Sequence, residues 1–313
     1  MRISVLTIVR GRQTHLENQL RGLLRSEIYP DQWIVVGMDQ EVQIAVDKIM
    51  MEHSRTEQKV RDRVAVAGRD SIDTCPFEIR TSRVDGDGRQ LPLAEARNRA
   101  ASLCQTEGMI FLDVDCIAAP QMIGTFRTTL KEQPRLWMGD VRYLPAAATE
   151  GGWQMPSLFK HAVDHPLQPI LQPAQRIDSD RYELFWSLCF AITRDDFFTI
   201  GGFDDSFDGY GGEDTDFAFS ACQAEVPFGF VGATAFHQYH AVCKPPLNHF
   251  EAIVRNAIRF QNKWGVWPME SWLNAFADRG LIRFNPDANK LVILRNPTAE
   301  EIRSSETQTP AGF

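Results

Sequence analysis

Three carboxylates stand close together directly after a glycine-rich stretch of the chain. Glu213, Asp214 and Asp216 follow Gly211 and Gly212, and an apolar segment with helical spacing begins after them. This order predicts a glycine turn and then a helix with the acids in its first turn, where exposed N–H groups and the helix dipole stabilise negative charge. Acidic first turns are also common without any function. The cluster alone therefore supports an ordinary helix start and a functional site equally.

A second pair of acids, Asp113 and Asp115, ends the apolar run 109–112. Open parallel sheets bind their ligands at the carboxyl ends of the strands. Because side chains alternate along an extended segment, we expect both carboxylates on the same side of the strand. One can then bind a divalent cation while the other binds a hydroxyl group. A pair of solvated carboxylates at a strand end is the alternative.

Two of the seven histidines, His237 and His240, are separated by three positions shortly after another predicted strand. Imidazole combined with carboxylate oxygen suits first-row transition ions such as Mn²⁺. A structural role is the commoner one for a single histidine, and the spacing alone is a weak signal. The pair gains weight because Asp113 and Asp115 also favour a metal.

Arginines follow the first predicted strand, which covers residues 3–9. Arg10 and Arg12 stand in the loop after it, and guanidinium groups bind phosphates through paired hydrogen bonds. Loops after strands often carry binding residues. The position of these two arginines therefore favours a phosphate-binding role.

A calcium loop is a competing interpretation of the acids before the glycine turn. Four residues match the first, third, fifth and sixth positions of an EF-hand-like loop: Asp204, Ser206, Asp208 and Gly209. The twelfth position, which needs a bidentate glutamate, holds Thr215. No apolar helical segment precedes the loop closely enough, so the sequence disfavours calcium here.

Strands and helices are predicted to alternate along most of the chain. Apolar runs predict strands at 3–9, 33–38, 64–67, 77–84, 109–112, 137–144, 184–193 and 228–231. Helical spacing is found from Leu16 to Leu24, in the stretch that follows Asp39 and ends at about residue 53, at 93–104, at 120–132 and at 217–224. This alternation is typical of an α/β domain.

Two regions depart from the alternation. Residues 145–181 are rich in Pro, Gln and His without a steady period, and we expect this excursion to cover the site, as long loops in compact domains often do. After Pro245 and Pro246, two helices at 247–264 and 269–277 and a hairpin at 281–294 are predicted. We expect a disordered tail from Ser304.

Composition narrows the function classes. The 313 residues carry a formal charge of −8, which argues against broad nucleic-acid or anionic-membrane binding. The six cysteines contain no CxxC pair, which favours reduced thiols over a disulfide framework or structural zinc. The first residues do not read as a signal peptide, and the apolar runs are too short for a membrane span. A soluble cytoplasmic protein is expected.

With these residues together, the chain resembles the nucleotide-sugar-dependent glycosyltransferases of the GT-A fold. It is more closely similar to bacterial family 2 enzymes that share motifs with the animal β-1,4-galactosyltransferases. Four segments carry the resemblance in the right order: Arg-Gly-Arg-Gln at 10–13, Ala-Arg-Asn-Arg-Ala at 96–100, Phe-Leu-Asp-Val-Asp at 111–115, and Gly-Gly-Phe at 201–203 with Tyr-Gly-Gly-Glu-Asp at 210–214. The last block is the most specific.

The resemblance implies a fold and a domain organisation. The fold is α/β, a Rossmann-like nucleotide-diphospho-sugar transferase with a mixed sheet flanked by helices and a small helical C-terminal appendage. The transferase domain covers 1–245, with a donor half at about 1–118 and an acceptor half at about 119–245. The appendage covers 246–303 and the tail 304–313.

The resemblance also implies roles for individual residues. The nucleotide and its phosphates are assigned to Arg10, Arg12, Asp39, Arg99 and Asp113. Mn²⁺ or Mg²⁺ is assigned to Asp115 with one or both of His237 and His240. Asp214 is implied as the general base and Glu213 as a ligand of sugar hydroxyls, while the acceptor side is assigned to Tyr210, Gly211, Gly212 and Trp186.

The implied activity is an inverting, metal-dependent hexosyl transfer from a nucleoside-diphosphate sugar to an acceptor hydroxyl. UDP and galactose are favoured through the resemblance alone, and the acceptor can be a glycan, a glycolipid or a small molecule. A sugar-1-phosphate nucleotidyltransferase is one alternative, although such enzymes usually carry a Gly-rich loop after the first strand and this chain has only Gly11 there. A non-catalytic sugar-binding protein on the same fold is the other.

Overall fold

The computed structural model describes residues 1–51, 75–86, 88 and 90–307. The strand predicted at 64–67 and the end of the helix predicted near residue 53 lie outside the described residues. Helical residues 43–51 form the described part of that helix.

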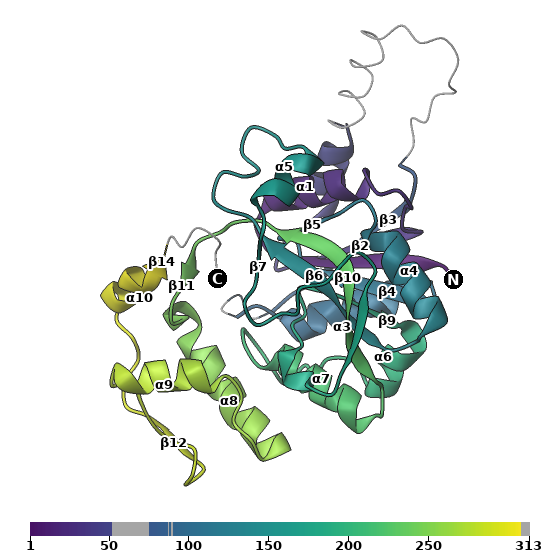
Figure 1. Cartoon of the computed structure of the whole chain (residues 1–313). Helices are drawn as coiled ribbons and strands as arrows, with labels where there is room; N and C mark the ends of the chain where they lie inside the picture. Colours follow the sequence, from purple (N-terminus) through teal and green to yellow (C-terminus); the bar gives the residue numbers. More distant parts are fainter. Residues whose placement is uncertain (52–74, 87, 89, 308–313) are drawn as a thin grey trace, which may run out of the picture.

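A ten-stranded mixed sheet forms the centre of the molecule (Figure 1). Its first half is parallel, in the order β3, β2, β1, β4, with bounds Glu78–Val84, Gln32–Met38, Ile3–Val9 and Gly108–Leu112. The order continues through β9, β6, β10 and β5, with bounds Cys189–Thr193, Leu136–Tyr143, Phe228–His237 and Cys116–Ala118. Short strands β7 (Val163–Asp164) and β8 (Arg176–Ser179) pair with β6 and β10. The predicted mixed α/β fold is confirmed.

Helices cover both faces of this sheet. On one face, α1 (Gln13–Leu23), residues 43–51 and α4 (Met122–Glu132) contribute to one hydrophobic cluster. On the other face, α3 (Leu93–Leu103), α6 (Arg194–Ile200) and α7 (Glu213–Gln223) contribute to a second (Figure 1). All seven residues of β1 are buried, as expected for a strand covered on both faces.

Several predicted elements differ from the structure. The strand predicted at 184–193 is shorter, because Tyr182–Leu184 forms a 3₁₀ turn and pairing begins only at Cys189. The strand predicted at 228–231 instead extends to His237, across an irregular register between Val231 and Thr234. Helix α6 and strand β5 were not predicted. Both are short, and β5 has only three residues.

The excursion at 145–181 contains more regular structure than its composition predicts. It holds α5 (Met155–His161) and the short strands β7 and β8. The side chains of Trp153 and Leu158 are buried with Phe236 and Ile117 in a small cluster of their own. The excursion is therefore packed against β5 and β10.

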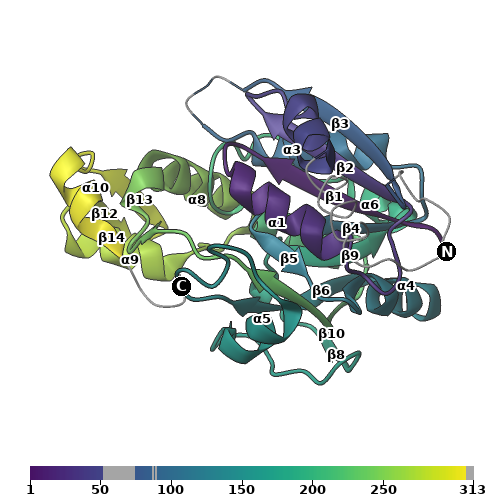
Figure 2. The same cartoon turned by 90° about the horizontal axis from the view of Figure 1, so that it is seen from above.

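The C-terminal elements gather at the side of the molecule opposite α4 (Figure 2). They comprise η2 (Leu247–His249), α8 (Phe250–Trp264), α9 (Glu270–Asp278), the β12–β13 hairpin (Ile282–Asn285 and Lys290–Ile293) and α10 (Ala299–Ser305). These elements share a separate hydrophobic cluster. The tail was expected from Ser304, but α10 runs to Ser305 and β14 (Glu306–Thr307) pairs with β11 (Val242–Cys243). The rest of the expected tail lies outside the described residues.

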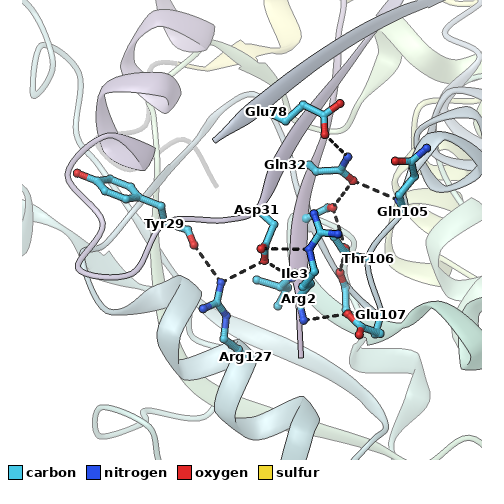
Figure 3. A network of polar contacts seen from close by, with 12 residues as sticks. Arg2, Ile3, Tyr29, Asp31, Gln32, Glu78, Gln105, Thr106, Glu107 and Arg127 are labelled. Carbon is cyan, nitrogen blue, oxygen red and sulfur yellow. Dashed lines mark hydrogen bonds and ion pairs between the residues drawn. The ribbon is translucent and has the colours of Figure 1, made fainter. Parts of the chain in front are cut away.

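A network of polar contacts holds the sheet at the amino ends of its parallel strands (Figure 3). Asp31 accepts hydrogen bonds from the Ile3 N–H at 2.8 Å and from the Arg2 and Arg127 guanidinium groups, each at 3.3 Å. Gln32 donates to Glu78 at 2.7 Å. This edge is consolidated by internal contacts, and the opposite edge carries the candidate site.

In the part of the chain that the structure describes, none of the helices has both the length and the apolar character needed to cross a membrane.

Candidate active site

The carboxyl ends of the parallel strands bring five of the predicted site residues to one edge of the sheet. Arg10 and Arg12 follow β1, Asp39 follows β2, and Asp113 and Asp115 follow β4. Because the parallel strands share one direction, these side chains meet at the same edge, where open α/β sheets bind ligands.

The segment from Asp113 to Asp115 is a turn, which corrects the expectation of an extended strand end. The Cys116 N–H donates to the Asp113 carbonyl at 2.8 Å. The Asp113 side chain approaches Arg97 of α3, whereas Asp115 contacts His15 of α1, and these helices cover opposite faces of the sheet. The two carboxylates therefore have different partners and different environments.

A buried amide fixes this turn. Gln19 of α1 is fully buried, and its side-chain N–H group lies 2.8 Å from the Asp113 carbonyl and 3.2 Å from the Cys116 carbonyl. Its side-chain oxygen accepts from the Thr7 hydroxyl on β1 at 2.8 Å. The turn is thus held in place by the helix that packs beside it.

Asp115, His237 and His240 form a cluster of candidate metal ligands. One ligand atom from each lies within 4.8 Å of the others, and His240 Nε2 is 3.6 Å from Asp115 Oδ2. The antiparallel pairing of β10 with β5 places His237 opposite Cys116 and hence beside Asp115. Nitrogen and oxygen ligands bind divalent transition ions at about 2.0 to 2.2 Å, so small side-chain movements let all three reach one ion. The donor set therefore fits a divalent cation.

His15 contacts this cluster and was missed by the sequence analysis. Its Nδ1 lies 2.6 Å from Asp115 Oδ1, and the Arg12 guanidinium donates to the same oxygen at 2.9 Å. Burial raises the pKa of Asp115, but the His15 hydrogen bond and the Arg12 charge outweigh it and lower that pKa to about 2. Position 15 lies one helical turn after Arg12, and that spacing was the available signal.

Both histidines of the cluster are held neutral. Burial lowers the pKa of His237 to about 4, and the nearby Asp115 charge only partly opposes this effect. Burial and the Arg12 charge also lower the pKa of His240. Neutral imidazole is the form that binds metal ions.

Arg97 connects the Asp113 turn to the start of α7. Its side chain is almost completely buried, with one guanidinium nitrogen 3.2 Å from Glu213 Oε1 and another 3.6 Å from Asp113 Oδ1. The guanidinium also lies over the Phe203 ring, 5.1 Å from its centre. A buried cation therefore compensates the buried Glu213 carboxylate and the partly exposed Asp113 carboxylate.

Arg99, in contrast, does not lie at the site. It is exposed and donates to the Ser82 hydroxyl on β3 at 3.0 Å. Residues two apart on a helix point in nearly opposite directions, so Arg97 and Arg99 cannot both face the sheet edge. Arg97, and not Arg99, therefore makes the ion pairs with Asp113 and Glu213.

The acids at the start of α7 have separate surroundings. Glu213 is buried and accepts from the Gly211 N–H at 3.0 Å in addition to its ion pair with Arg97. Asp214 is partly exposed and accepts from the Thr215 N–H at 2.8 Å. Gly211 and Gly212 have φ values of 98° and 88°, which favour glycine at both turn positions.

Two carboxyl groups at the site have raised pKa values. Burial and the Glu213 charge raise the pKa of Asp214 to about 7, against the opposing charge of Arg97. Burial likewise raises the pKa of Asp113 to about 6, although Arg97 opposes it. Asp214 can thus exchange a proton near neutral pH.

Asp216, the third acid, supports the loop instead of facing the site. It is almost fully buried and accepts from Lys263 and from the Trp264 indole N–H at 2.7 Å. Lys263 also lies 3.0 Å from Asp204. The lysine ammonium group therefore stands beside the acids considered as a calcium loop, which gives them a cationic partner from the protein itself.

Helix α8 also holds the glycine turn. The buried Asn256 side chain donates to the Asp208 carbonyl at 3.1 Å and to the Gly211 carbonyl at 2.9 Å. Arg255 donates to the same Asp208 carbonyl at 2.6 Å. The loop that precedes Glu213 is thus fixed by a helix from the C-terminal part of the chain.

The two aromatic residues assigned to sugars lie in different ring clusters. Tyr210 is 37% exposed and stacks on His249 and Trp272, with centroid distances of 4.6 and 5.9 Å. Part of its ring is therefore already covered by C-terminal side chains. Trp186 contacts His165 of the excursion edge to face at 4.6 Å.

The His165 ring connects the excursion to the candidate metal ligands. It lies 5.7 Å from the Tyr143 ring, which in turn lies 4.9 Å from the His237 ring. The excursion therefore approaches the cluster through a row of aromatic side chains.

A separate set of polar contacts lies beyond the ends of β1 and β2. Arg10 lies 3.3 Å from Asp39 and donates to the Gln90 and Gly88 carbonyls at 3.3 and 3.1 Å. Asp39 accepts from the Gly86 N–H at 2.8 Å. Both residues are thus placed by contacts with the segment between β3 and α3.

Comparison with known families gives one match. The family model described as the N-terminal domain of galactosyltransferase matches residues 177–241, about a fifth of the chain. The matched segment contains the Gly-Gly-Glu-Asp block and His237 and His240. It confirms the similarity to galactosyltransferases that this block indicates. A comparison with curated proteins found no match.

Comparison with solved structures gives distant likenesses. A crystal structure of GalNAc-T7 with UDP, GalNAc and Mn²⁺ has a TM-score of 0.48 and 14% identity, covering 77% of this chain and 44% of that one. S. aureus TarS 1–349 has a TM-score of 0.49 and 12% identity, covering 84% and 66%. Its complex with UDP has a TM-score of 0.47. The chain thus spans less than two thirds of the structures that it resembles, and likeness at this level says nothing about activity.

Proposed function

We propose that this protein is an inverting, metal-dependent glycosyltransferase that moves a hexose from a nucleoside-diphosphate sugar to an acceptor hydroxyl. The observation that carries the proposal is the pairing of both Asp113 and the buried Glu213 with the buried Arg97 guanidinium. It joins the Asp113 turn, where donor phosphates and a cation would bind, to the acids of α7, where an acceptor would lose its proton.

The donor is assigned to the edge of the sheet beyond β1 and β2. Arg10 and Asp39 would contact the nucleoside, and Arg12 would lie near the phosphates because it is bonded to Asp115. UDP and galactose are proposed from the motif resemblance and from the galactosyltransferase match over residues 177–241.

Asp115, His237 and His240 would hold the Mn²⁺ or Mg²⁺ ion. When bound, such an ion supplies positive charge that stabilises a diphosphate leaving group. The low pKa of Asp115 and of His237 keeps a carboxylate and a neutral imidazole ready for a cation at neutral pH.

Asp214 is assigned as the general base. Its pKa of about 7 suits proton transfer from a hydroxyl group near neutral pH, because efficient bases titrate close to the working pH. As the acceptor oxygen bonds to the anomeric carbon, its proton moves to the Asp214 carboxylate, and the bond from that carbon to the diphosphate oxygen breaks so that the nucleoside diphosphate leaves. A single displacement inverts the configuration there, and Glu213, held by Arg97, would bind a sugar hydroxyl.

The 145–181 excursion is proposed to cover the bound donor and limit its hydrolysis by water. This covering role is supported by the contacts of the His165 ring with Trp186 and Tyr143, beside the candidate metal ligands.

The proposal is tested by thermal stabilisation with a panel of nucleotide sugars, with and without Mn²⁺. A ligand that binds the folded state raises the melting temperature as its concentration increases. We expect a UDP-hexose to stabilise the protein only with the cation, and NMR of the transfer product to show inversion. Retained anomeric configuration would refute the single displacement. Pyrophosphate release from UTP and a sugar 1-phosphate would instead identify a nucleotidyltransferase.

A further inference from the structure

Buried amides lie directly behind the candidate metal ligands. Asn18 of α1 and Gln238, which stands between His237 and His240, have 3% and 0% of their surface exposed. Buried polar side chains are costly unless they are hydrogen bonded. Their partners therefore indicate what these two side chains hold in place.

Gln238 is fixed through its backbone N–H and through both the oxygen and the nitrogen of its side-chain amide. Its backbone N–H donates to the Asp115 carbonyl at 2.6 Å. Its side-chain oxygen accepts from the Asn18 amide at 2.8 Å, and its side-chain N–H group donates to the His15 carbonyl at 3.1 Å. The residue between the two histidines is thus bonded to Asp115 and to the backbone of the residue that contacts the Asp115 carboxylate.

Asn18 extends this set of bonds to the excursion. Its side-chain oxygen accepts from the Trp153 indole N–H at 2.9 Å. Trp153 is 7% exposed and belongs to the buried cluster that contains Phe236, next to His237 in β10. One continuous row of hydrogen bonds therefore runs from the excursion to the segment that carries both histidines.

We propose that Trp153, Asn18 and Gln238, named here the amide row, are positioning residues that set the geometry of His237 and His240 relative to Asp115. The proposal rests on the proposed function, because it requires Asp115, His237 and His240 to bind a divalent cation. Residues that orient metal ligands from behind typically change metal affinity by about 10- to 100-fold when they are replaced. Neutral amides suit this task because they hold the ligands without adding charge to the site.

A substitution at Gln238 and a matched one at Gln32 distinguish positioning from general stability. Both glutamines are fully buried, but Gln32 bonds to Ser4 and Glu78 at the opposite edge of the sheet (Figure 3). Gln238→Met and Gln32→Met each keep the volume and remove the amide. We expect both to lower the melting temperature in the absence of metal.

The deciding measurement is Mn²⁺ affinity of the whole chain without nucleotide, from the EPR signal of free Mn²⁺. We expect Gln238→Met to weaken binding by at least about tenfold and Gln32→Met to leave it unchanged. Trp153→Phe, which removes only the indole N–H and is the safer variant for folding, should weaken binding by at least about twofold.

The possible outcomes separate the two proposals. If the wild-type chain binds Mn²⁺ and both Gln238→Met and Trp153→Phe bind it equally well, the amide row is refuted and the metal site stands. Equal weakening by Gln32→Met would also refute the amide row, because the loss would then be one of general stability. If the wild-type chain binds no Mn²⁺, the metal site of the proposed function fails, and the amide row fails with it.

Discussion

Replacing Asp214 by asparagine should remove activity and at the same time stabilise the protein at neutral pH. Asparagine keeps an oxygen that can accept from the Thr215 N–H. Burial and the Glu213 charge hold the pKa of Asp214 near 7, about three pH units above its ordinary value of 3.8. Each pH unit corresponds to 1.36 kcal/mol, so an ionised Asp214 costs up to about 4 kcal/mol of folding free energy.

The sign of the pH dependence follows from the direction of this pKa change. A carboxyl group whose pKa is raised in the folded state is favourable while protonated, and this advantage is lost as pH rises towards 7. The free energy of unfolding of Asp214→Asn should therefore be close to that of the wild type at pH 4. At pH 8 it should exceed the wild-type value by about 2 to 4 kcal/mol.

Urea denaturation at pH 4, 5, 6, 7 and 8 measures this difference, with Asp180→Asn, at an exposed position, as the control. The control should change stability by less than about 0.5 kcal/mol throughout. A stability difference between Asp214→Asn and wild type that does not vary with pH would refute the reasoning about burial.

Turnover gives the second readout of the same variant. Loss of a general base lowers turnover by about 10²- to 10⁴-fold, and wild-type turnover should itself fall as pH drops below 7 because Asp214 becomes protonated. Turnover of Asp214→Asn close to that of the wild type would exclude Asp214 as the base, whatever its effect on stability.

Three further predictions concern the supports of the site. Arg97→Met should lower the free energy of unfolding by about 3 to 5 kcal/mol, because it leaves the buried Glu213 carboxylate without its cation, whereas Arg99→Met should change it by less than about 0.5 kcal/mol. Equal losses in urea denaturation would contradict the assignment of Arg97. Lys263→Met should cost about 1 to 3 kcal/mol because it removes the cation from a buried carboxylate, while Asp204→Asn should cost at most about 1 kcal/mol because that pair is partly exposed. UDP with Mn²⁺ should slow proteolysis within 145–181, and cleavage at an unchanged rate would argue against a covering role.

The sequence predicted the regular strands well and the turns poorly. The β-branched run at 3–9 matches β1 because burial on both faces of a sheet selects continuous apolar residues. The turn at 113–115 escaped prediction because its geometry depends on Gln19, a distant residue whose amide holds the turn carbonyls. A pattern in one segment cannot report a hydrogen bond from another helix.

The helical phase of the apolar residues in α3 distinguishes Arg97 from Arg99. The buried residues of α3 include Leu93, Ala94, Ala101 and Arg97, which recur at helical spacing. Arg99 falls on the opposite face. The phase of the apolar residues therefore identifies Arg97 as the arginine that faces the sheet.

The hydrogen bonds between α8 and the glycine turn have a consequence for transplanting the proposed activity. The segment 177–241 contains the proposed base and both histidines. The side chains that hold its turn, Asn256 and Lys263, follow it in the chain, and Arg97 precedes it. A chimera that receives only residues 177–241 would contain the proposed base and the histidines without the residues that position them. A transplanted segment must therefore include α3 and α8 as well.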